Sequence, residues 1–278
     1  MTRVPRLALA LLLAVFAAAC TSEPDDVEVP MRSGTAASVL IDRWFVDAPS
    51  AAPGTMLVLG GRAAIFLECG VLSGEWRAAD GGLFVADVRG GSPACWRTQG
   101  ARDLPWLRRA AAFRSEGEEV VLLAPDGTTT ARLRPGAEPT AGPDHSEQYA
   151  AQPAPSAEQL RRMREPAALP AEAVAPTPAQ LQRRWTPLRV SPRAEAAFLS
   201  FADGGTWQGS DGCNSTGGRY VLGTAGRLIA TSGPQTLKGC DNWEGSSWLL
   251  NAARVGLVGG QLVIYDRASK EIGRVRPA

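Results

Sequence analysis

The sequence CNSTGGRY, Cys213–Tyr220, has a counterpart in CGVLSGEW, Cys69–Trp76, which lies 144 positions earlier. In both stretches a Gly follows the Cys by five positions and an aromatic residue follows it by seven. Similar offsets, from 141 to 145 positions, relate further pairs along the chain: Trp44 and Trp185, Gly81–Ala86 and Ala225–Ala230, Cys95 and Cys240, Pro105–Phe113 and Ser247–Val255, and Ala131–Gly136 and Gly273–Ala278. So constant an offset indicates an internal repeat, and we predict two copies of one domain.

Within each copy the hydrophobic pattern has mostly a period of two. Short runs such as GRYVLG and QLVIYD alternate with Gly and Asp turns, which is typical of antiparallel strands. Helical spacing occurs in Asn242–Leu257 and in its counterpart Asp103–Phe113, where Pro105 suits the first helical position and Asp103 the cap. We predict a mainly β fold with two small β-barrel-like domains. Each is a curled antiparallel sheet, closed or nearly closed, with one helix before the last two strands.

The repeat also sets the domain boundaries. The first copy spans residues 38–136 and the second spans residues 183–278, and the stretch 137–182 between them is rich in Pro and Ala. This composition is typical of a semi-extended linker. One short helix is expected around Ser156–Glu165, where Ser156 is a suitable N-cap for an amphiphilic segment.

The N-terminus predicts export and a lipid anchor. Two Arg residues precede an apolar run, Leu7–Ala19, that is too short to cross a bilayer but fits an export signal. The sequence AAAC, Ala17–Cys20, resembles a bacterial lipobox. Residues 1–19 are therefore predicted to be a signal peptide, Cys20 to carry a diacylglycerol and often a third acyl chain, and residues 20–37 to be a flexible tether. The alternative is an ordinary secretory signal that ends near an unrelated Cys.

The second copy resembles the META domain (HslJ-like) family over about residues 184–278. The order and spacing of the motif residues carry the resemblance: Trp185, Gly209, Gly212, Cys213, Asn214, Tyr220, Thr236 and Cys240. The first copy is a diverged relative, with Gly70 in the place of Asn214 and Trp76 in the place of Tyr220. The resemblance implies a compact β-barrel-like fold without established enzymatic activity and an association with the cell envelope or with stress.

Besides Cys20, two Cys residues fall in each copy. Matching pairs in an exported chain predict disulfides, here Cys69–Cys95 and Cys213–Cys240. The alternative is a metal site or a catalytic thiol. However, the sequence has no CxxC motif, and its one His, His145, lies in the linker. We therefore expect no metal and no cofactor.

Charge and motifs argue against several classes of function. The 29 basic and 28 acidic residues nearly cancel, which does not favour a nucleic-acid partner. No phosphate-binding loop is present, and His145 is badly placed for a catalytic triad. Carboxylates such as Glu195, Asp203 and Asp211 leave open an enzyme that acts on a cell-wall polymer. Asp before Gly more often builds a hairpin turn.

Tryptophans give the remaining candidates for binding. Trp44, Trp106, Trp185 and Trp248 recur between the copies and are expected in the cores. The binding candidates are the non-recurring tryptophans and the polar residues of the Gly-Cys-Asn corner: Trp207, Trp243, Asn214, Asp211, Trp76 and Trp96. We also expect that corner to be a tight turn with a positive φ within Ser215–Gly218.

The expected protein is thus lipid-anchored, faces outside the cytoplasm and is not an enzyme. It is expected to bind an envelope protein, a polymer or an apolar ligand, or to support envelope integrity under stress. The alternatives are an enzyme acting through acidic residues and a lipoprotein that inhibits hydrolases.

Overall fold

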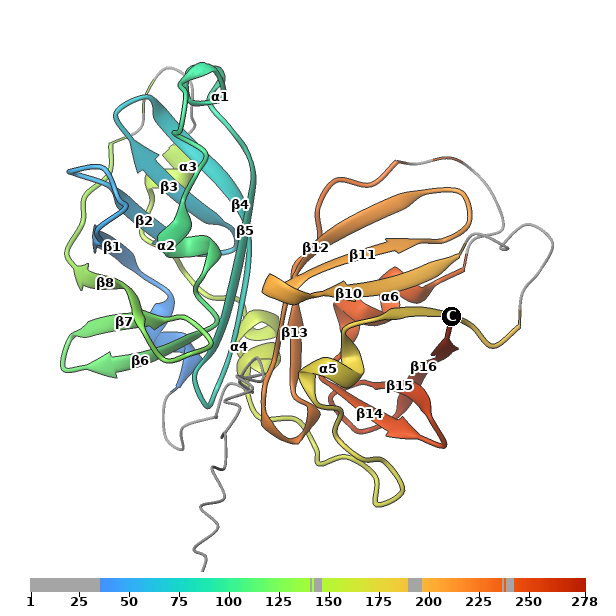
Figure 1. Cartoon of the computed structure of the whole chain (residues 1–278). Coiled ribbons are helices and arrows are strands. Elements are labelled where there is room, and N and C mark those ends of the chain that lie inside the picture. Colours follow the sequence, from blue (N-terminus) through green and yellow to red (C-terminus); the bar gives the residue numbers. More distant parts are fainter. Residues whose placement is uncertain (1–35, 141, 143–146, 190–196, 237, 239–242) are drawn as a thin grey trace, which may run out of the picture.

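Two β-domains lie side by side in the computed structural model, which describes residues 36–140, 142, 147–189, 197–236, 238 and 243–278 (Figure 1). The N-terminal domain is a closed barrel in which every strand pairs antiparallel with its neighbours in sequence and β8 pairs with β1. Its strands are β1 (Arg43–Asp47), β2 (Met56–Leu59), β3 (Ala63–Leu67), β4 (Gly70–Ala79), β5 (Leu83–Gly91), β6 (Ala112–Glu116), β7 (Glu119–Leu123) and β8 (Thr129–Pro135). Closure leaves this sheet without an exposed edge.

The C-terminal domain is an eight-stranded antiparallel sheet that nearly closes. Its strands are β9 (Arg184–Pro187), β10 (Phe198–Ala202), β11 (Thr206–Ser210), β12 (Ser215–Leu222), β13 (Leu228–Ala230), β14 (Arg254–Val258), β15 (Gln261–Tyr265) and β16 (Glu271–Pro277). Strand β9 pairs with both β10 and β16, so β13 and β14 become the two ends of the sheet. One isolated bridge, between Arg227 and Arg254, joins these ends. The predicted mainly β fold with two barrel-like domains is confirmed.

The same strand order occurs in both domains, with β1–β8 matching β9–β16, and equivalent aromatic residues make equivalent contacts. The Trp44 indole donates a hydrogen bond to the Leu40 carbonyl at 2.9 Å, and the Trp185 indole donates to the Leu181 carbonyl at 3.0 Å. Each carbonyl lies four residues before its Trp. Leu40 and Leu181 end matching short helices, the 3-10 helix η1 (Ala37–Leu40) and α5 (Pro178–Leu181).

A second pair of aromatic residues is related in the same way despite a change of residue type. Trp76 in β4 donates its indole N–H to the Gly60 carbonyl at 2.8 Å, and Tyr220 in β12 donates its hydroxyl to the Ala202 carbonyl at 3.0 Å. The two acceptors each follow or end the second strand of their domain. A buried indole and a buried phenol both need a partner for their polar atom, so the repeat keeps the acceptor when the ring changes.

The Gly shared by the quoted stretches permits close contact with the next strand. A Cβ on Gly74 would lie 2.0 Å from the Asp87 carbonyl oxygen, and one on Gly218 would lie 2.1 Å from the Thr231 carbonyl oxygen. Neither distance is compatible with a side chain. Strands β4 and β12 can therefore approach β5 and β13 this closely only where Gly stands.

Helices precede the last three strands of each domain, one strand more than predicted. In the N-terminal domain they are α1 (Pro93–Arg97) and α2 (Pro105–Arg108), and in the C-terminal domain α6 (Gly245–Asn251). Pro105 occupies the start of α2 as expected, but Leu104 is the N-cap and Asp103 pairs with Arg108 instead. The predicted second helix is too long at its C-terminal end, because residues from Arg254 onward join the sheet as β14.

The described part of the linker is docked on the domains, unlike the semi-extended spacer expected from its composition. It contains α3 (Glu147–Ala150) and α4 (Ala157–Met163), and the predicted cap is confirmed because the Ser156 side chain accepts the Gln159 N–H. Tyr149 packs on the outer face of the N-terminal barrel, and Met163 is part of that barrel's core. Leu181, near the end of the linker, is buried in the core of the C-terminal domain.

The two domains pack through the outer faces of β4–β5 and β12–β13 (Figure 1). Leu83 and Val85 point out of the N-terminal barrel and form one buried cluster with Val221 and Ile229 of the C-terminal domain. Their neighbours along the strands point into the two separate cores. These strands are thus apolar on both faces, which is the pattern of strands covered on both sides.

No helix within the described part of the chain is both long and apolar enough to span a bilayer. The predicted signal peptide, Cys20 and most of the tether lie outside the described residues, as do His145, Glu195 and Cys240.

Candidate functional site

One predicted disulfide is confirmed. Cys69 and Cys95 are bonded with their Cα atoms 5.0 Å apart, and the bond ties the start of β4 to α1. Cys213 is also disulfide-bonded. Its predicted partner, Cys240, lies outside the described residues, so the Cys213–Cys240 pairing remains a prediction.

The Asp211 carboxylate, proposed above as a binding or catalytic candidate, organises the Gly-Cys-Asn corner. It is buried, and one oxygen accepts the backbone N–H groups of Cys213 and Asn214 while the other accepts the Asn214 side-chain amide. Burial by itself raises the pKa of Asp211, but the hydrogen bonds from Asn214 and Cys213 outweigh it, so the pKa lies below its ordinary value. The carboxylate is ionised and engaged in the turn.

Asn214 links this corner to a distant loop. Its side-chain oxygen accepts the Thr236 hydroxyl at 2.9 Å and the Lys238 N–H at 2.7 Å, and its amide donates to the Lys238 carbonyl at 3.1 Å. The predicted positive φ within Ser215–Gly218 is wrong, because these residues lie in β12 and the positive φ of 95° belongs to Gly212. Asp211 and Asn214 therefore have structural contacts that account for their residue types.

Two of the four tryptophans proposed for binding are in the cores. The Trp207 side chain is 1% exposed and donates its indole N–H to the Thr231 carbonyl at 2.8 Å. Trp76 is buried in the other barrel. The prediction of solvent-facing rings is wrong for both, because the alternation of their strands points them inward.

The other two candidate tryptophans lie nearer the surface. Trp96 is 39% exposed, with the Arg102 guanidinium 4.4 Å from its ring centroid. Trp243 is half-buried and packs edge-on against Trp248 with ring centroids 5.4 Å apart. Three of the recurring tryptophans, Trp44, Trp106 and Trp185, are buried as predicted, and Trp248 is half-buried.

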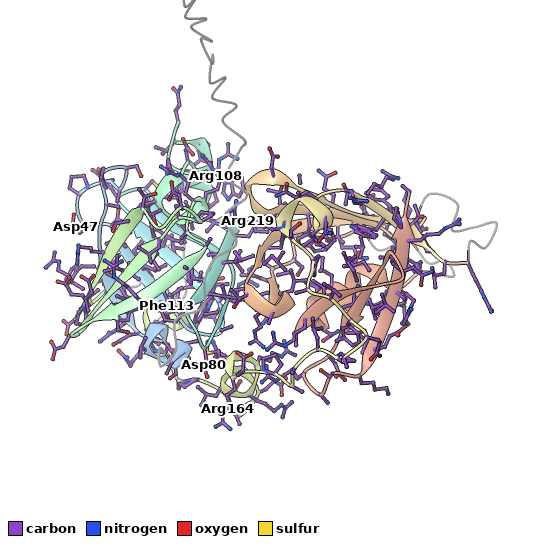
Figure 2. The ribbon with its side chains drawn as sticks, turned by 60° about the horizontal axis from the view of Figure 1, so that its bottom comes forward. Asp47, Asp80, Arg108, Phe113, Arg164 and Arg219 are labelled. Atoms are coloured by element: carbon purple, nitrogen blue, oxygen red, sulfur yellow. A yellow bond between two sulfur atoms is a disulfide. The ribbon has the colours of Figure 1, made fainter. Side chains whose placement is uncertain are left out.

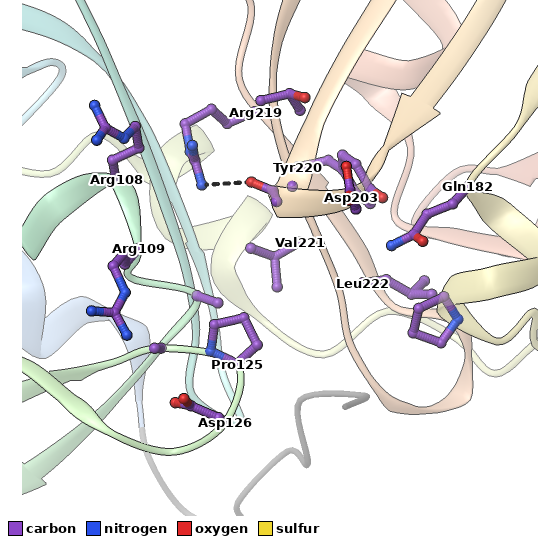
Figure 3. A pocket seen from close by; sticks show the side chains of 16 residues that line it. Arg108, Arg109, Pro125, Asp126, Gln182, Asp203, Arg219, Tyr220, Val221 and Leu222 are labelled. Atoms are coloured by element: carbon purple, nitrogen blue, oxygen red, sulfur yellow. Dashed lines mark hydrogen bonds between the residues drawn. The ribbon is translucent and has the colours of Figure 1, made fainter. Parts of the chain in front are cut away.

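A cavity of about 630 Å³ opens between the two domains, and none of its residues except Asp203 and Tyr220 was singled out from the sequence (Figure 3). We call it the Arg219 cavity. The N-terminal domain contributes the end of α2 and the β7–β8 turn, the linker contributes α5, and the C-terminal domain contributes β12 and the turn before β11. The lining side chains include Arg108, Arg109, Ala111, Ala124, Pro125, Asp126, Gln182, Asp203, Arg219, Tyr220, Val221 and Leu222.

Arg219 is the buried cation of this cavity. It lies beside Arg108 across the domain boundary (Figure 2), and its Nη2 donates to the Gly204 carbonyl at 3.3 Å, whereas its Nε has no hydrogen-bond partner among the described residues. Burial lowers the pKa of Arg219, the Asp87 carboxylate opposes this change, and Arg108 adds to it. A desolvated guanidinium with an open donor attracts an anionic group.

Some of the other charged side chains of the cavity already have ion-pair or hydrogen-bond partners. Arg108 forms an ion pair with Asp103 at 2.7 Å, and Asp126 accepts hydrogen bonds from the backbone and hydroxyl of Thr128. Arg109 has no carboxylate partner in an ion pair among the described residues. The cavity thus offers two cations, Arg109 and Arg219, without such a partner.

The wall of the cavity is apolar between these charges. Val221 of β12 points toward the N-terminal domain, where Pro125 lies on the other side of the cavity (Figure 3), and Ala124 and Leu222 add apolar surface to the lining. Burial raises the pKa of Tyr220 to about 12, so its hydroxyl stays protonated and continues to donate to Ala202. The arrangement can hold a molecule with an anionic group and an apolar part.

The cavity escapes prediction because it exists only where two domains meet. The sequence carried one usable signal, the uninterrupted apolar run Tyr220–Leu222, since a strand with one solvated face would place a polar residue at Val221.

Comparisons with protein-family models, with curated proteins and with solved structures find no match to the chain. Among the described residues no group of His, Cys, Asp and Glu side chains is arranged to hold a metal ion.

Proposed function

We propose that the chain is a lipid-anchored envelope protein of the META (HslJ-like) type, and that it acts by binding a ligand in the Arg219 cavity. The observation that carries this proposal is the cavity itself. Its volume of about 630 Å³ lies within the usual range for small-molecule sites, and it combines an apolar wall with two cations that have no ion-pair partner in the described part of the chain. A small amphipathic acid, or the acidic end of an envelope polymer, has the matching chemistry.

Binding is favoured over catalysis by the hydrogen bonds of Asp211. The enzyme alternative named Glu195, Asp203 and Asp211, and both oxygens of Asp211 are engaged with Cys213 and Asn214. A general acid or base needs a free oxygen within reach of the substrate. In the cavity, one oxygen of Asp126 accepts both hydrogen bonds from Thr128, and Asp203 begins the 3-10 helix η2 (Asp203–Gly205).

Membrane attachment is supported by the N-terminal sequence. The apolar run Leu7–Ala19 and the lipobox-like Ala17–Cys20 favour processing at Cys20. Two or three acyl chains hold a protein to a bilayer far more firmly than one chain does. The tether would then present the two docked domains outside the cytoplasm.

Native mass spectrometry of the full chain tests the binding function. The protein is purified from membranes in mild detergent, exposed to an extract of the envelope, and compared with the variants Arg109→Glu and Arg276→Glu. Arg109 is exposed at the rim of the cavity, and Arg276 is exposed on β16, outside it.

We expect a ligand with an acidic group to be retained by the native chain and by Arg276→Glu, and to be lost from Arg109→Glu. Retention of no ligand, or equal retention by both variants, would contradict the proposal.

A further inference from the structure

A second cavity, of about 350 Å³, lies at the other end of the domain boundary. We call it the Arg227 cavity. Strand β4 of the N-terminal domain, helix α4 of the linker, and β13 with the β15–β16 turn of the C-terminal domain all contribute to it. Figure 2 shows Arg164, just after α4, and Asp80, just after β4, at this end, away from Arg108 and Arg219.

The side chains of the Arg227 cavity carry an excess of positive charge. Five arginines line it, Arg77, Arg161, Arg162, Arg227 and Arg267, against two carboxylates, Glu158 and Asp266. The difference is three positive charges.

Both carboxylates already have partners outside the group formed by Arg77, Arg227 and Arg267. Glu158 forms ion pairs with Arg161 and Arg162 on its own helix, where it lies three and four residues before them. One Asp266 oxygen accepts the backbone N–H groups of Ala268 and Lys270 in the β15–β16 turn. Among the described residues, therefore, no carboxylate forms an ion pair with Arg77, Arg227 or Arg267.

Arg227 is the most deeply buried of these cations. It is 1% exposed, its Nη2 donates to the Arg164 carbonyl at 3.0 Å, and its Nε and Nη1 are buried without a hydrogen-bond partner among the described residues. Burial lowers the pKa of Arg227 to about 10, Glu165 opposes this change, and Arg267 and Arg254 add to it. The group is still charged at neutral pH, and a buried charge without a counter-ion is unfavourable.

Neighbouring contacts hold the cations in place. Arg267 donates to the carbonyls of Arg162 and Arg164 at 2.9 and 2.8 Å, so the last turn of α4 fixes its guanidinium. Arg254, behind Arg227, forms an ion pair with Glu165 and donates to the Ala167 carbonyl at 2.9 Å. Glu165, the carboxylate that most opposes the lowering of the Arg227 pKa, is therefore also engaged in an ion pair.

We propose that the Arg227 cavity binds a phosphate group, and that the bound anion compensates Arg77, Arg227 and Arg267. A phosphate carries up to two negative charges and several acceptor oxygens, which suits a cluster of guanidinium groups. The cavity is larger than one phosphate ion, so an organic substituent fits as well. The phosphate could belong to a soluble phosphate ester or to the headgroup of an anionic phospholipid.

Calorimetric titration of the full chain, at constant ionic strength, tests this site with three probes. They are sodium phosphate, glycerol phosphate and the short-chain lipid dihexanoyl phosphatidylglycerol, and sodium citrate serves as a carboxylate comparison. The main variant is Arg77→Gln, because Arg77 is half-buried and its loss removes a cation without removing a hydrogen bond to the linker. Arg276→Gln is the matched control.

We expect at least one phosphate probe to bind, and Arg77→Gln to weaken it by about tenfold or more while Arg276→Gln leaves it unchanged. Tighter binding of the lipid than of glycerol phosphate identifies a headgroup as the source, and the reverse order identifies a soluble ester; either result supports the site. Absence of binding, equal binding by Arg77→Gln, or equally tight binding of citrate would overturn the proposal. An Arg227→Gln variant with native circular dichroism should lose the same affinity, and unchanged binding by it would also overturn the proposal.

Discussion

Glu75 of the N-terminal barrel accepts two hydrogen bonds from Ser232 of the C-terminal domain, one from its backbone N–H at 3.1 Å and one from its hydroxyl at 3.2 Å. The two residues are 157 positions apart in the chain and sit beside the apolar cluster of the domain interface. The contact joins β4 to the segment that follows β13 across the domain interface.

Replacing Glu75 should loosen the interface. In Glu75→Ala the Ser232 donors lose their acceptor, and an unmade hydrogen bond of this kind costs about 1–3 kcal/mol. Urea unfolding should show an earlier transition, while Glu118→Ala, at an exposed turn position, should leave the midpoint within error. Identical midpoints for the two variants would mean that the contact contributes nothing to domain packing.

Trp207 and Trp96 should respond very differently to truncation. Trp207→Ala removes a buried ring and its hydrogen bond to Thr231, and should reduce the free energy of unfolding by about 3–5 kcal/mol. Trp96→Ala, at an exposed site, should change it by about 0.5 kcal/mol or less. Chemical denaturation followed by circular dichroism measures both, and similar losses would contradict the placement of Trp207 in the core.

The Cys69–Cys95 bond should stabilise the N-terminal domain. It closes a loop with a sequence separation of 26, which corresponds to about 3 kcal/mol in the chain-entropy description. The double variant Cys69→Ser with Cys95→Ser should lose a similar amount in denaturant unfolding. Alkylation of the native chain without reductant should leave both thiols unlabelled, and labelling of either one would refute the bond.

The Asp211 turn should make stability depend on acid pH. The folded pKa of Asp211 is below its ordinary value, so its ionised form stabilises the fold above the unfolded pKa of about 4, and this contribution is lost as pH falls through the folded pKa. Asp211→Asn should therefore be less stable than the native chain at neutral pH, with a difference that shrinks below about pH 4. Thermal unfolding across pH measures this difference, and one that grew in acid would show the opposite linkage.

Cys20 should decide the location of the protein. Under the proposed lipid anchor, Cys20→Ser should move the chain from the membrane fraction to the soluble fraction. Fractionation followed by immunoblotting tests this. A Cys20→Ser chain that stays with the membranes would refute the anchor.

The internal repeat made the domain architecture predictable. Trp44 and Trp185, or Gly74 and Gly218, keep their spacing because each meets a constraint local to one domain: a carbonyl four residues earlier, or a neighbouring strand too close for a Cβ. Constraints of this local kind produce a repeated spacing in the sequence, which can be recognised before the structure is known.

Features that depend on contacts between distant segments were harder to predict from the sequence. The orientation of Trp207 depends on which face of β11 is enclosed. The absence of a matching Trp in the first copy did not indicate a solvent-facing ring. The Arg219 cavity joins arginines from two parts of the chain and the Arg227 cavity joins them from three, and their spacing in sequence carries no period. The end of α6 is set by pairing of β14 with β15, which local helical spacing does not reveal.

The bridge between Arg227 and Arg254 bears on where a fragment containing the C-terminal domain has to begin. These two residues complete the nearly closed C-terminal sheet, and their side chains are held by the carbonyls of Arg164 and Ala167. A fragment that begins at residue 183 would keep every strand of the second copy. It would lack those carbonyls, and it would also lack Leu181, which accepts the Trp185 indole N–H. The second half of this chain thus depends on contacts from residues before the boundary predicted at residue 183, and the match between η1 and α5 places the last of these residues, Leu181, within the repeated unit.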